Sequence, residues 1–94
     1  MQFIPSNEIK VSVLPEQRPW VCSPDMIRRM VQREDTIAFD IWEEKQLVGF
    51  AMLRRFQEGE WFLWEYMIAG EQQGRGYGRK ALQELIRLMQ TQYG

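Results

Sequence analysis

The stretch QQGRGYGRKAL places three glycines, Gly74, Gly76 and Gly78, at the entrance of a predicted helix. Glycine in a helix interior costs about 0.5–1 kcal/mol relative to alanine, so these positions call for a functional explanation. The unpaired amides of a helix's first turn, with the positive end of its macrodipole, form an anion site that glycines leave accessible. Three cationic side chains stand at the same end: Arg75, Arg79 and Lys80. The pattern predicts a site for phosphate or pyrophosphate.

Two well-known phosphate motifs fail on individual residues. A Walker A loop ends in Gly-Lys-Ser or Gly-Lys-Thr, whereas Lys80 is preceded by arginine and followed by alanine. A dinucleotide fingerprint needs a third glycine where Arg79 stands, and no βα unit of the required kind precedes the turn. The pattern that remains is Gln73-x-x-Gly76-x-Gly78. The alternatives to a specific phosphate site are a plain tight turn and a surface that binds an anionic partner through its cations alone.

The bulk composition excludes several classes of function. The chain has 94 residues, a formal net charge of −1, no histidine and a single cysteine, Cys22. This charge balance argues against nucleic-acid binding and against a polybasic membrane surface. A disulfide framework and a histidine-based triad are excluded, no metal site is expected, and Cys22 is interpreted as a small apolar filler. No apolar run is long enough to span a bilayer and the start lacks a signal-peptide core, so a cytoplasmic protein is expected.

A length of 94 residues predicts a single domain over residues 1–94. Residues 1–22 show no sustained period and are expected to be an irregular lead-in. A helix is predicted over 23–33, with Ser23 as its N-cap and Pro24 at its first helical position.

An antiparallel three-strand meander is predicted over 36–68 by one alternating run, TIAFDIW, and two runs that are apolar on both faces, LVGFAMLRR and WFLWEYMI. Strands of the second kind are expected in the middle of a sheet that is covered on both sides. A last helix is predicted over 74–93 from its apolar stripe. The stripe is expected to be buried and consists of Tyr77, Ala81, Leu82, Leu85, Ile86 and Met89. The fold class is therefore α+β, or α/β, with antiparallel central strands flanked by helices.

The glycine turn and its surroundings resemble the GCN5-related N-acetyltransferase (GNAT) superfamily. The coenzyme A signature of that family is Q/R-x-x-G-x-G/A at the start of the helix after the fourth strand, and QQGRGYGRKAL matches it at Gln73, Gly76 and Gly78. The segments VLPEQRPWVCSP, LVGFAML and EWFLWEYMI are similar to diamine and polyamine acetyltransferases of the BltD and PaiA kind. The resemblance covers about residues 10–94 and implies a partial GNAT fold.

This resemblance implies a reaction and a cosubstrate site. The expected reaction is direct transfer of the acetyl group of acetyl-CoA to a small primary amine, with polyamines among the candidates and without a metal or a covalent enzyme intermediate. The main chain of Met67 and Ile68 is expected to pair with the pantetheine arm. The pyrophosphate is expected on the backbone amides of the turn, which runs through Gln73, Gly74, Arg75, Gly76, Tyr77, Gly78 and Arg79.

Three residues of the last predicted strand are candidates for chemistry. Glu65 is the only charged residue in WFLWEYMI, and a carboxylate among apolar neighbours is expected to have a raised pKa, which suits a general base or a clamp for a substrate ammonium. The alternative for Glu65 is a cross-strand ion pair, for instance with Arg54. Trp61 and Trp64 are candidates for a cation–π wall around a polyamine, with packing as the alternative.

The resemblance is incomplete at the end of the chain. In the family a fifth strand follows the coenzyme A helix and splays from the fourth strand to form the pantetheine slot, and a further helix carries a general-acid tyrosine. Neither follows LMQTQYG, so the chain is expected to be a shortened relative or a fragment. If WFLWEYMI is an unprotected edge strand, self-association, for example as a homodimer, is expected to cover it.

Two functions from different classes remain after these steps. The first is an acetyl-CoA-dependent N-acetyltransferase. The second is a non-catalytic GNAT-like module that binds acyl-CoA or dimerises. Turnover of acetyl-CoA distinguishes the two.

Overall fold

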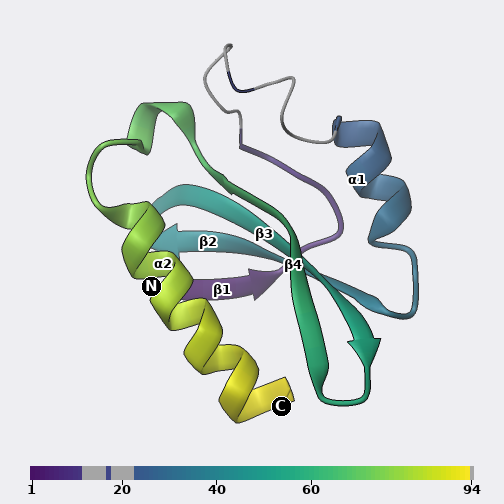
Figure 1. Ribbon diagram of the computed structural model, residues 1–94. Coiled ribbons are helices and arrows are strands. Elements are labelled where there is room, and N and C mark those ends of the chain that lie inside the picture. The colour runs from purple at the N-terminus through teal and green to yellow at the C-terminus, as the bar shows by residue number, and fades with distance from the viewer. Residues whose placement is uncertain (12–16, 18–22, 94) are drawn as a thin grey trace.

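The computed structural model describes residues 1–11, 17 and 23–93, so the interpretation of Cys22 lies outside the described residues. The described part of the chain forms one antiparallel sheet in the order β1-β2-β3-β4, with helices packed against it (Figure 1). The elements follow the chain as β1 (Gln2–Pro5), α1 (Pro24–Met30), β2 (Thr36–Glu43), β3 (Gln46–Gln57), β4 (Glu60–Ile68), the 3-10 turn η2 (Gly70–Gln72), α2 (Tyr77–Leu88) and the π-helical turn η3 (Met89–Tyr93). The predicted α+β fold class is confirmed.

α2 packs on one face of the sheet and α1 packs on the other. Successive side chains of a strand point to opposite faces, so one strand can contribute to the core on both sides. The cluster under α2, the α2-side cluster, consists of Phe39, Ile41, Val48, Ala51, Leu53, Ala81 and Leu85. The cluster under α1, the α1-side cluster, consists of Ile27, Ala38, Phe50, Met52 and Met67. β2 and β3 contribute to both clusters, so these two strands form the centre of the fold.

α1 begins where its local signals predict, α2 begins later than predicted, and both helices are shorter than the predicted ranges. The predicted N-cap is confirmed, since the Ser23 hydroxyl oxygen accepts a hydrogen bond from the amide of Met26 at 3.3 Å. α1 ends earlier than the predicted 23–33, and α2 begins later than the predicted 74–93, because the backbone before Tyr77 is not helical. No helix in the described part of the chain is long and apolar enough to cross a membrane.

The prediction of an irregular lead-in over 1–22 is wrong at Gln2–Pro5, which form β1. β1 pairs antiparallel with β2 and places Phe3 opposite Ile41. The ring of Phe3 meets that of Phe39 edge-on, with the ring centroids 6.2 Å apart. A strand of four residues is too short to show a period, so only its pairing partner reveals it.

β4 lies at an edge of the sheet, so the prediction that this apolar strand lies in the middle of the sheet is wrong. Phe62 and Leu63 remain 42% and 38% exposed. The predicted stripe of α2 is only partly buried for a related reason. Leu82 and Ile86 are 37% and 51% exposed, because α2 covers residues of β2 and β3 and no strand lies beyond β4 in the described part of the chain.

A carboxylate network joins the loop after α1 to the sheet. Asp35 accepts hydrogen bonds from Arg33 Nε at 3.1 Å, from Arg54 Nε at 2.9 Å and from Thr36 Oγ1 at 3.1 Å. The hydrogen bonds from Arg33, and then those from Arg54 and Thr36, hold the pKa of Asp35 well below its ordinary value. Ionised Asp35 therefore stabilises the fold above its unfolded-state pKa of about 3.9, and this contribution is lost as the pH falls toward the folded-state pKa.

Replacement of Asp35 by asparagine is expected to reduce the sensitivity of the fold to acid. Between about pH 6 and about pH 3, the urea midpoint of the wild type should fall further than that of Asp35→Asn. Only in the wild type does the unfolded chain take up a proton at position 35 in this range while the folded protein does not. Glu34→Gln, which removes the exposed charge of the preceding residue, should keep the wild-type pH dependence. If wild type and Asp35→Asn lose stability equally, the network does not contribute as described.

Candidate functional site

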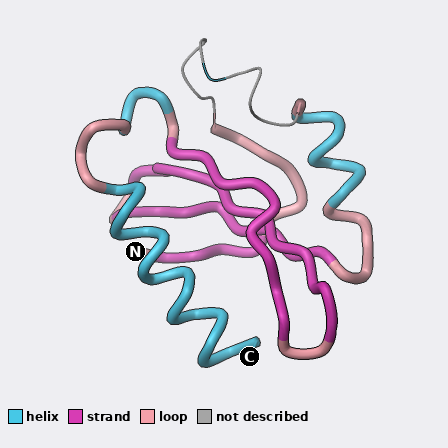
Figure 2. Tube along the Cα trace, in the orientation of Figure 1, coloured by secondary structure: helices cyan, strands magenta, loops and turns pink. Residues whose placement is uncertain are grey.

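The glycine turn connects the end of β4 to the start of α2 (Figure 2). At the end of β4, the amide of Ala69 donates to the carbonyl of Val48 in β3 at 2.8 Å. η2 then turns the chain, and the amide of Gln73 donates to the carbonyl of Gly70 at 3.4 Å. The first amide of the predicted turn is therefore already engaged within the protein.

Two of the three glycines adopt a backbone conformation that other residues avoid. Gly74 and Gly76 have φ of +82° and +80°, in the left-handed region. A Cβ at either position would meet nothing within 4 Å, so the space beside the backbone is open. Gly78 lies in the first turn of α2, where a Cβ would make an ordinary contact of 3.6 Å with Ile68 Cγ1. The backbone thus calls for glycine at Gly74, the variable position of the motif, as much as at Gly76.

The start of α2 leaves several amides without a helical acceptor. Gly76 is the N-cap, and its carbonyl accepts from the amide of Lys80 at 3.2 Å. The amides of Tyr77, Gly78 and Arg79 precede this bond and have no carbonyl one turn earlier in the helix. They point out of the N-terminal end of α2, where the macrodipole adds positive potential.

Side-chain hydrogen bonds from Gln73 and from Tyr66 hold the two ends of the turn against β4. Gln73 Nε2 donates to the carbonyl of Ile68 at 3.0 Å, and it also donates to Gln17 Oε1 at 2.7 Å. At the other end of the turn, the hydroxyl of Tyr66 donates to the carbonyl of Gly78 at 2.5 Å. Neither Tyr66 nor Gln17 was predicted as part of the site. For Tyr66 one signal was available, since it carries the only hydroxyl in WFLWEYMI, whereas Gln17 stands in a stretch without a pattern.

A hollow of about 330 Å³ lies where these elements meet. It is lined by Gln17, Tyr66, Ile68, Gln72, Gln73, Gly74 and Gly78. Four of the predicted site residues are thus brought together: Ile68, Gln73, Gly74 and Gly78. The side chain of Met67 is not among them, because it is buried in the α1-side cluster on the other face of the sheet.

Close approach at Gly49 of β3 shapes the neighbouring end of β4. A Cβ on Gly49 would lie 2.5 Å from the carbonyl oxygen of Met67 and 3.1 Å from Cδ1 of Ile68. Only glycine therefore allows this approach without a shift of the backbone. The Met67 carbonyl approaches β3, whereas Ile68 is the residue of this pair that lines the hollow.

The three cations near the turn differ in their partners. Arg75 and Arg79 are exposed at the turn. Lys80 Nζ lies 2.7 Å from Glu43 Oε2 at the end of β2, and this hydrogen bond raises the pKa of Lys80 and lowers that of Glu43. The expectation that Lys80 adds positive charge for a phosphate is therefore corrected, because Glu43 compensates that charge. Within the described residues, no group of three or more His, Cys, Asp or Glu side chains is arranged to hold a metal ion.

Comparison with known protein families agrees with this geometry. The sequence matches the acetyltransferase (GNAT) family over residues 7–94. The chain belongs to the GNAT family. The predicted superfamily is confirmed, and GNAT domains use acetyl-CoA as their cosubstrate. No curated protein and no solved structure gave a match.

Trp61 and Trp64 of this GNAT chain lie on opposite faces of the sheet, so the prediction that they form a single cation–π wall is wrong. Trp61 packs on the α2-side cluster, and its ring meets that of Tyr93 edge-on, with the ring centroids 5.9 Å apart. Trp64 packs on the α1-side cluster, where the guanidinium of Arg54 lies 5.2 Å from its ring centroid. Residues three apart on a strand point to opposite faces, and Trp64 already has a cation from its own chain.

Glu65 is half-buried and follows a β-bulge. Leu63 pairs with Leu53 whereas Glu65 pairs with Met52, so Trp64 is the extra residue of β4. Because directly paired residues share a face, the pairing with Met52 places Glu65 on the α1 side, together with Trp64. Regular alternation would have placed it on the other face. Its role as a base or clamp stays a prediction.

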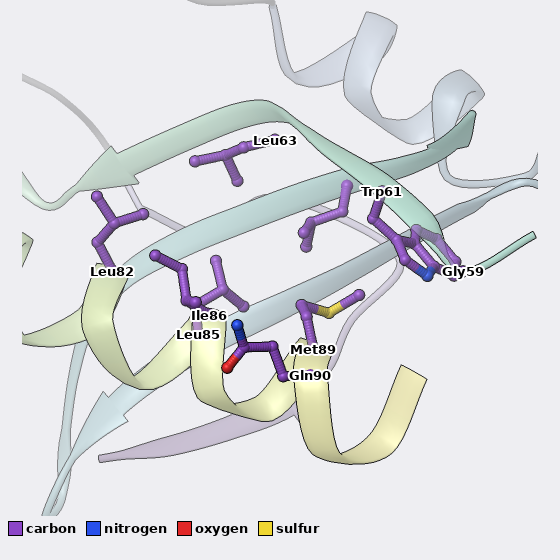
Figure 3. A pocket seen from close by; sticks show the side chains of 9 residues that line it. Gly59, Trp61, Leu63, Leu82, Leu85, Ile86, Met89 and Gln90 are labelled. Atoms are coloured by element: carbon purple, nitrogen blue, oxygen red, sulfur yellow. The ribbon is translucent and has the colours of Figure 1, made fainter. Parts of the chain in front are cut away.

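A second hollow, of about 280 Å³, lies between β4 and α2 and contains none of the turn residues (Figure 3). Its lining residues are all uncharged: Leu53, Gly59, Trp61, Leu63, Leu82, Leu85, Ile86, Met89 and Gln90. Figure 3 shows the side chains of Leu82 and Ile86 rising from α2 toward the sheet. Since Leu63 also belongs to the exposed edge strand, this GNAT chain presents an apolar surface from β4 to α2.

Proposed function

We propose that the chain binds acetyl-CoA at the glycine turn and transfers its acetyl group to a small primary amine. One observation supports this most: two left-handed glycines with open space beside them directly precede the unpaired amides of α2. Pyrophosphate oxygens accept hydrogen bonds from such amides, and Arg75 and Arg79 supply compensating charge. We assign the pyrophosphate to the turn 73–79 and the pantetheine arm to the main chain of Met67 and Ile68.

The proposed transfer is direct. The deprotonated amine attacks the carbonyl carbon of the thioester, a C–N bond forms, and the C–S bond breaks. After the attack the amine nitrogen carries a positive charge, and it loses one proton to become the nitrogen of the amide product. Coenzyme A leaves as a thiolate, which is then protonated to the thiol. Main-chain amides of the strand polarise the carbonyl. Glu65 is the proposed base, because it is a half-buried carboxylate of β4, the strand that leads into the glycine turn.

For the acceptor we propose polyamines as the first candidates, on the basis of the similarity of three segments to diamine and polyamine acetyltransferases. A cytoplasmic location is part of the same proposal. The single cysteine of the chain cannot form an internal disulfide, as suits a reducing compartment.

Calorimetric titration with CoA, followed by acetylation of a panel of polyamines and amino acids, tests the proposal. Free thiol release reports turnover, which should disappear in Gly78→Trp because the indole would occupy the hollow beside Ile68. Absence of CoA binding to the wild type would refute the proposal. Binding of CoA without turnover of any amine would favour the second candidate, a non-catalytic acyl-CoA-binding module.

We further propose that the chain forms a homodimer through the edge of β4. An edge strand with exposed Phe62 and Leu63 offers unpaired main-chain groups and apolar side chains to a second copy. The apolar hollow next to it adds area that a partner would cover. Light scattering at micromolar concentration measures the mass directly, and a monomeric mass would refute this part of the proposal.

A further inference from the structure

The side chain of Tyr66 reaches from β4 to the start of α2. Its ring packs on the α2-side cluster, and the residue lines the hollow beside the turn together with Gln73 and Gly78. The hydroxyl donates to the carbonyl of Gly78 at 2.5 Å. This hydrogen bond ties the strand that precedes the turn to the first helical residues that follow it.

The carbonyl of Gly78 shares a peptide plane with the amide of Arg79. This peptide is trans and planar, so its C=O and N–H point in opposite directions and can only rotate together. A hydrogen bond that holds the carbonyl toward Tyr66 therefore also holds the direction of the Arg79 N–H. That N–H has no acceptor within α2, since the first bond of the helix is the one from Lys80 to Gly76.

The glycines of the turn make its backbone flexible, so hydrogen bonds are needed to restrain it. Glycine loses more conformational freedom on folding than any other residue, and helix ends fray readily. Three glycines fall within this short stretch: Gly74, Gly76 and Gly78. The bond from Gln73 to the carbonyl of Ile68 restrains the start of the turn. The bond from Tyr66 restrains its end, where the unpaired amides are.

We propose that Tyr66 is a positioning residue for the cosubstrate: by holding the carbonyl of Gly78, it keeps the N–H of Arg79 directed at the pyrophosphate. The inference rests on the proposed function, because it requires a pyrophosphate at this turn. It adds a residue outside the glycine motif on which the affinity for the nucleotide end of acetyl-CoA depends.

The hydroxyl of Tyr66 remains a hydrogen-bond donor at neutral pH. Burial raises the pKa of Tyr66 above its ordinary value, and the opposing effect of a hydrogen bond from the Leu82 backbone does not reverse this direction. The phenol therefore keeps its proton, which the carbonyl of Gly78 requires.

The variant Tyr66→Phe removes the hydroxyl and keeps the ring. CoA, ADP and pantetheine are titrated by calorimetry into wild type and variant, since CoA and ADP contain a pyrophosphate and pantetheine does not. Loss of one positioning hydrogen bond should raise the dissociation constants of CoA and ADP about 5- to 10-fold and leave that of pantetheine unchanged. Tyr93→Phe is the matched control, because the ring of Tyr93 contacts Phe39 and Trp61 away from the turn, and all three constants should stay at wild-type values.

Each outcome decides the matter. Circular dichroism verifies that Tyr66→Phe is folded, and if its folded fraction is reduced, the titrations are made in sucrose, which favours the folded state. An unchanged dissociation constant for CoA overturns the inference and leaves the proposed function standing. Equal weakening of all three ligands also overturns it, because a general structural role would act on all of them. Absence of CoA binding to the wild type overturns both.

Discussion

Replacement of Gly76 by glutamate is expected to abolish coenzyme A binding. Gly76 has a φ of +80°, where other residues are strained by about 1–2 kcal/mol, and it faces open space. A glutamate side chain there would bring a carboxylate to the amides assigned to the pyrophosphate. Because like charges placed together at a binding site cost several kcal/mol, the dissociation constant should rise by about 100-fold or more.

The matched control for this experiment is Gly59→Glu. Gly59 also has a left-handed φ, +77°, and a Cβ there would likewise meet nothing within 4 Å, but it lies in the turn between β3 and β4. Both variants should lower the free energy of unfolding in urea by about 1–2 kcal/mol. Only Gly76→Glu should lose CoA in calorimetry. Wild-type affinity in Gly76→Glu would remove the glycine turn from the proposed site.

The second large effect is expected in the core, on replacement of Phe50 by alanine. Phe50 is fully buried in the α1-side cluster, where it is grouped with Ile27 of α1, Ala38 of β2 and Met67 of β4. Removal of its ring leaves a cavity that these elements cannot fill, and it should lower the free energy of unfolding by about 3–5 kcal/mol. Small domains are stable by only about 5–15 kcal/mol, so a large part of the folded population is at risk.

Phe56→Ala provides the comparison within the same strand. Phe56 also belongs to β3, but it is 75% exposed, so its replacement should change the free energy of unfolding by less than about 0.5 kcal/mol. Urea unfolding followed by circular dichroism measures both variants. Similar losses for the two would contradict the assignment of Phe50 to the core.

Elements with a local signal could be predicted from the sequence. Ser23 caps α1 as expected, because an N-cap depends only on a hydroxyl and an amide three residues later. The alternation in TIAFDIW predicted a strand, and β2 has Phe39 and Ile41 buried on one face. β1 had no comparable signal in its own residues, since its strand conformation depends on pairing with β2.

The position of β4 at the edge of the sheet could not be predicted from its own residues. Its run is apolar on both faces, as in a central strand, yet β4 is an edge, because a strand's neighbours depend on the whole chain. The bulge at Trp64 also reverses the face on which alternation would place Glu65. A residue count along β4 alone cannot reveal such a register shift.

For the candidate site, the sequence by itself determined the glycine turn, because a turn's backbone conformation depends on a few adjacent residues. The same few residues carry the motif that indicated the family. Only the tertiary structure decided which atoms hold that turn in place. The hydroxyl that binds the Gly78 carbonyl comes from Tyr66, and the carboxylate that compensates Lys80 comes from Glu43, 37 residues away in the chain. Contacts of this kind follow from strand register and from the packing of α2 on the sheet, which no short window of sequence contains.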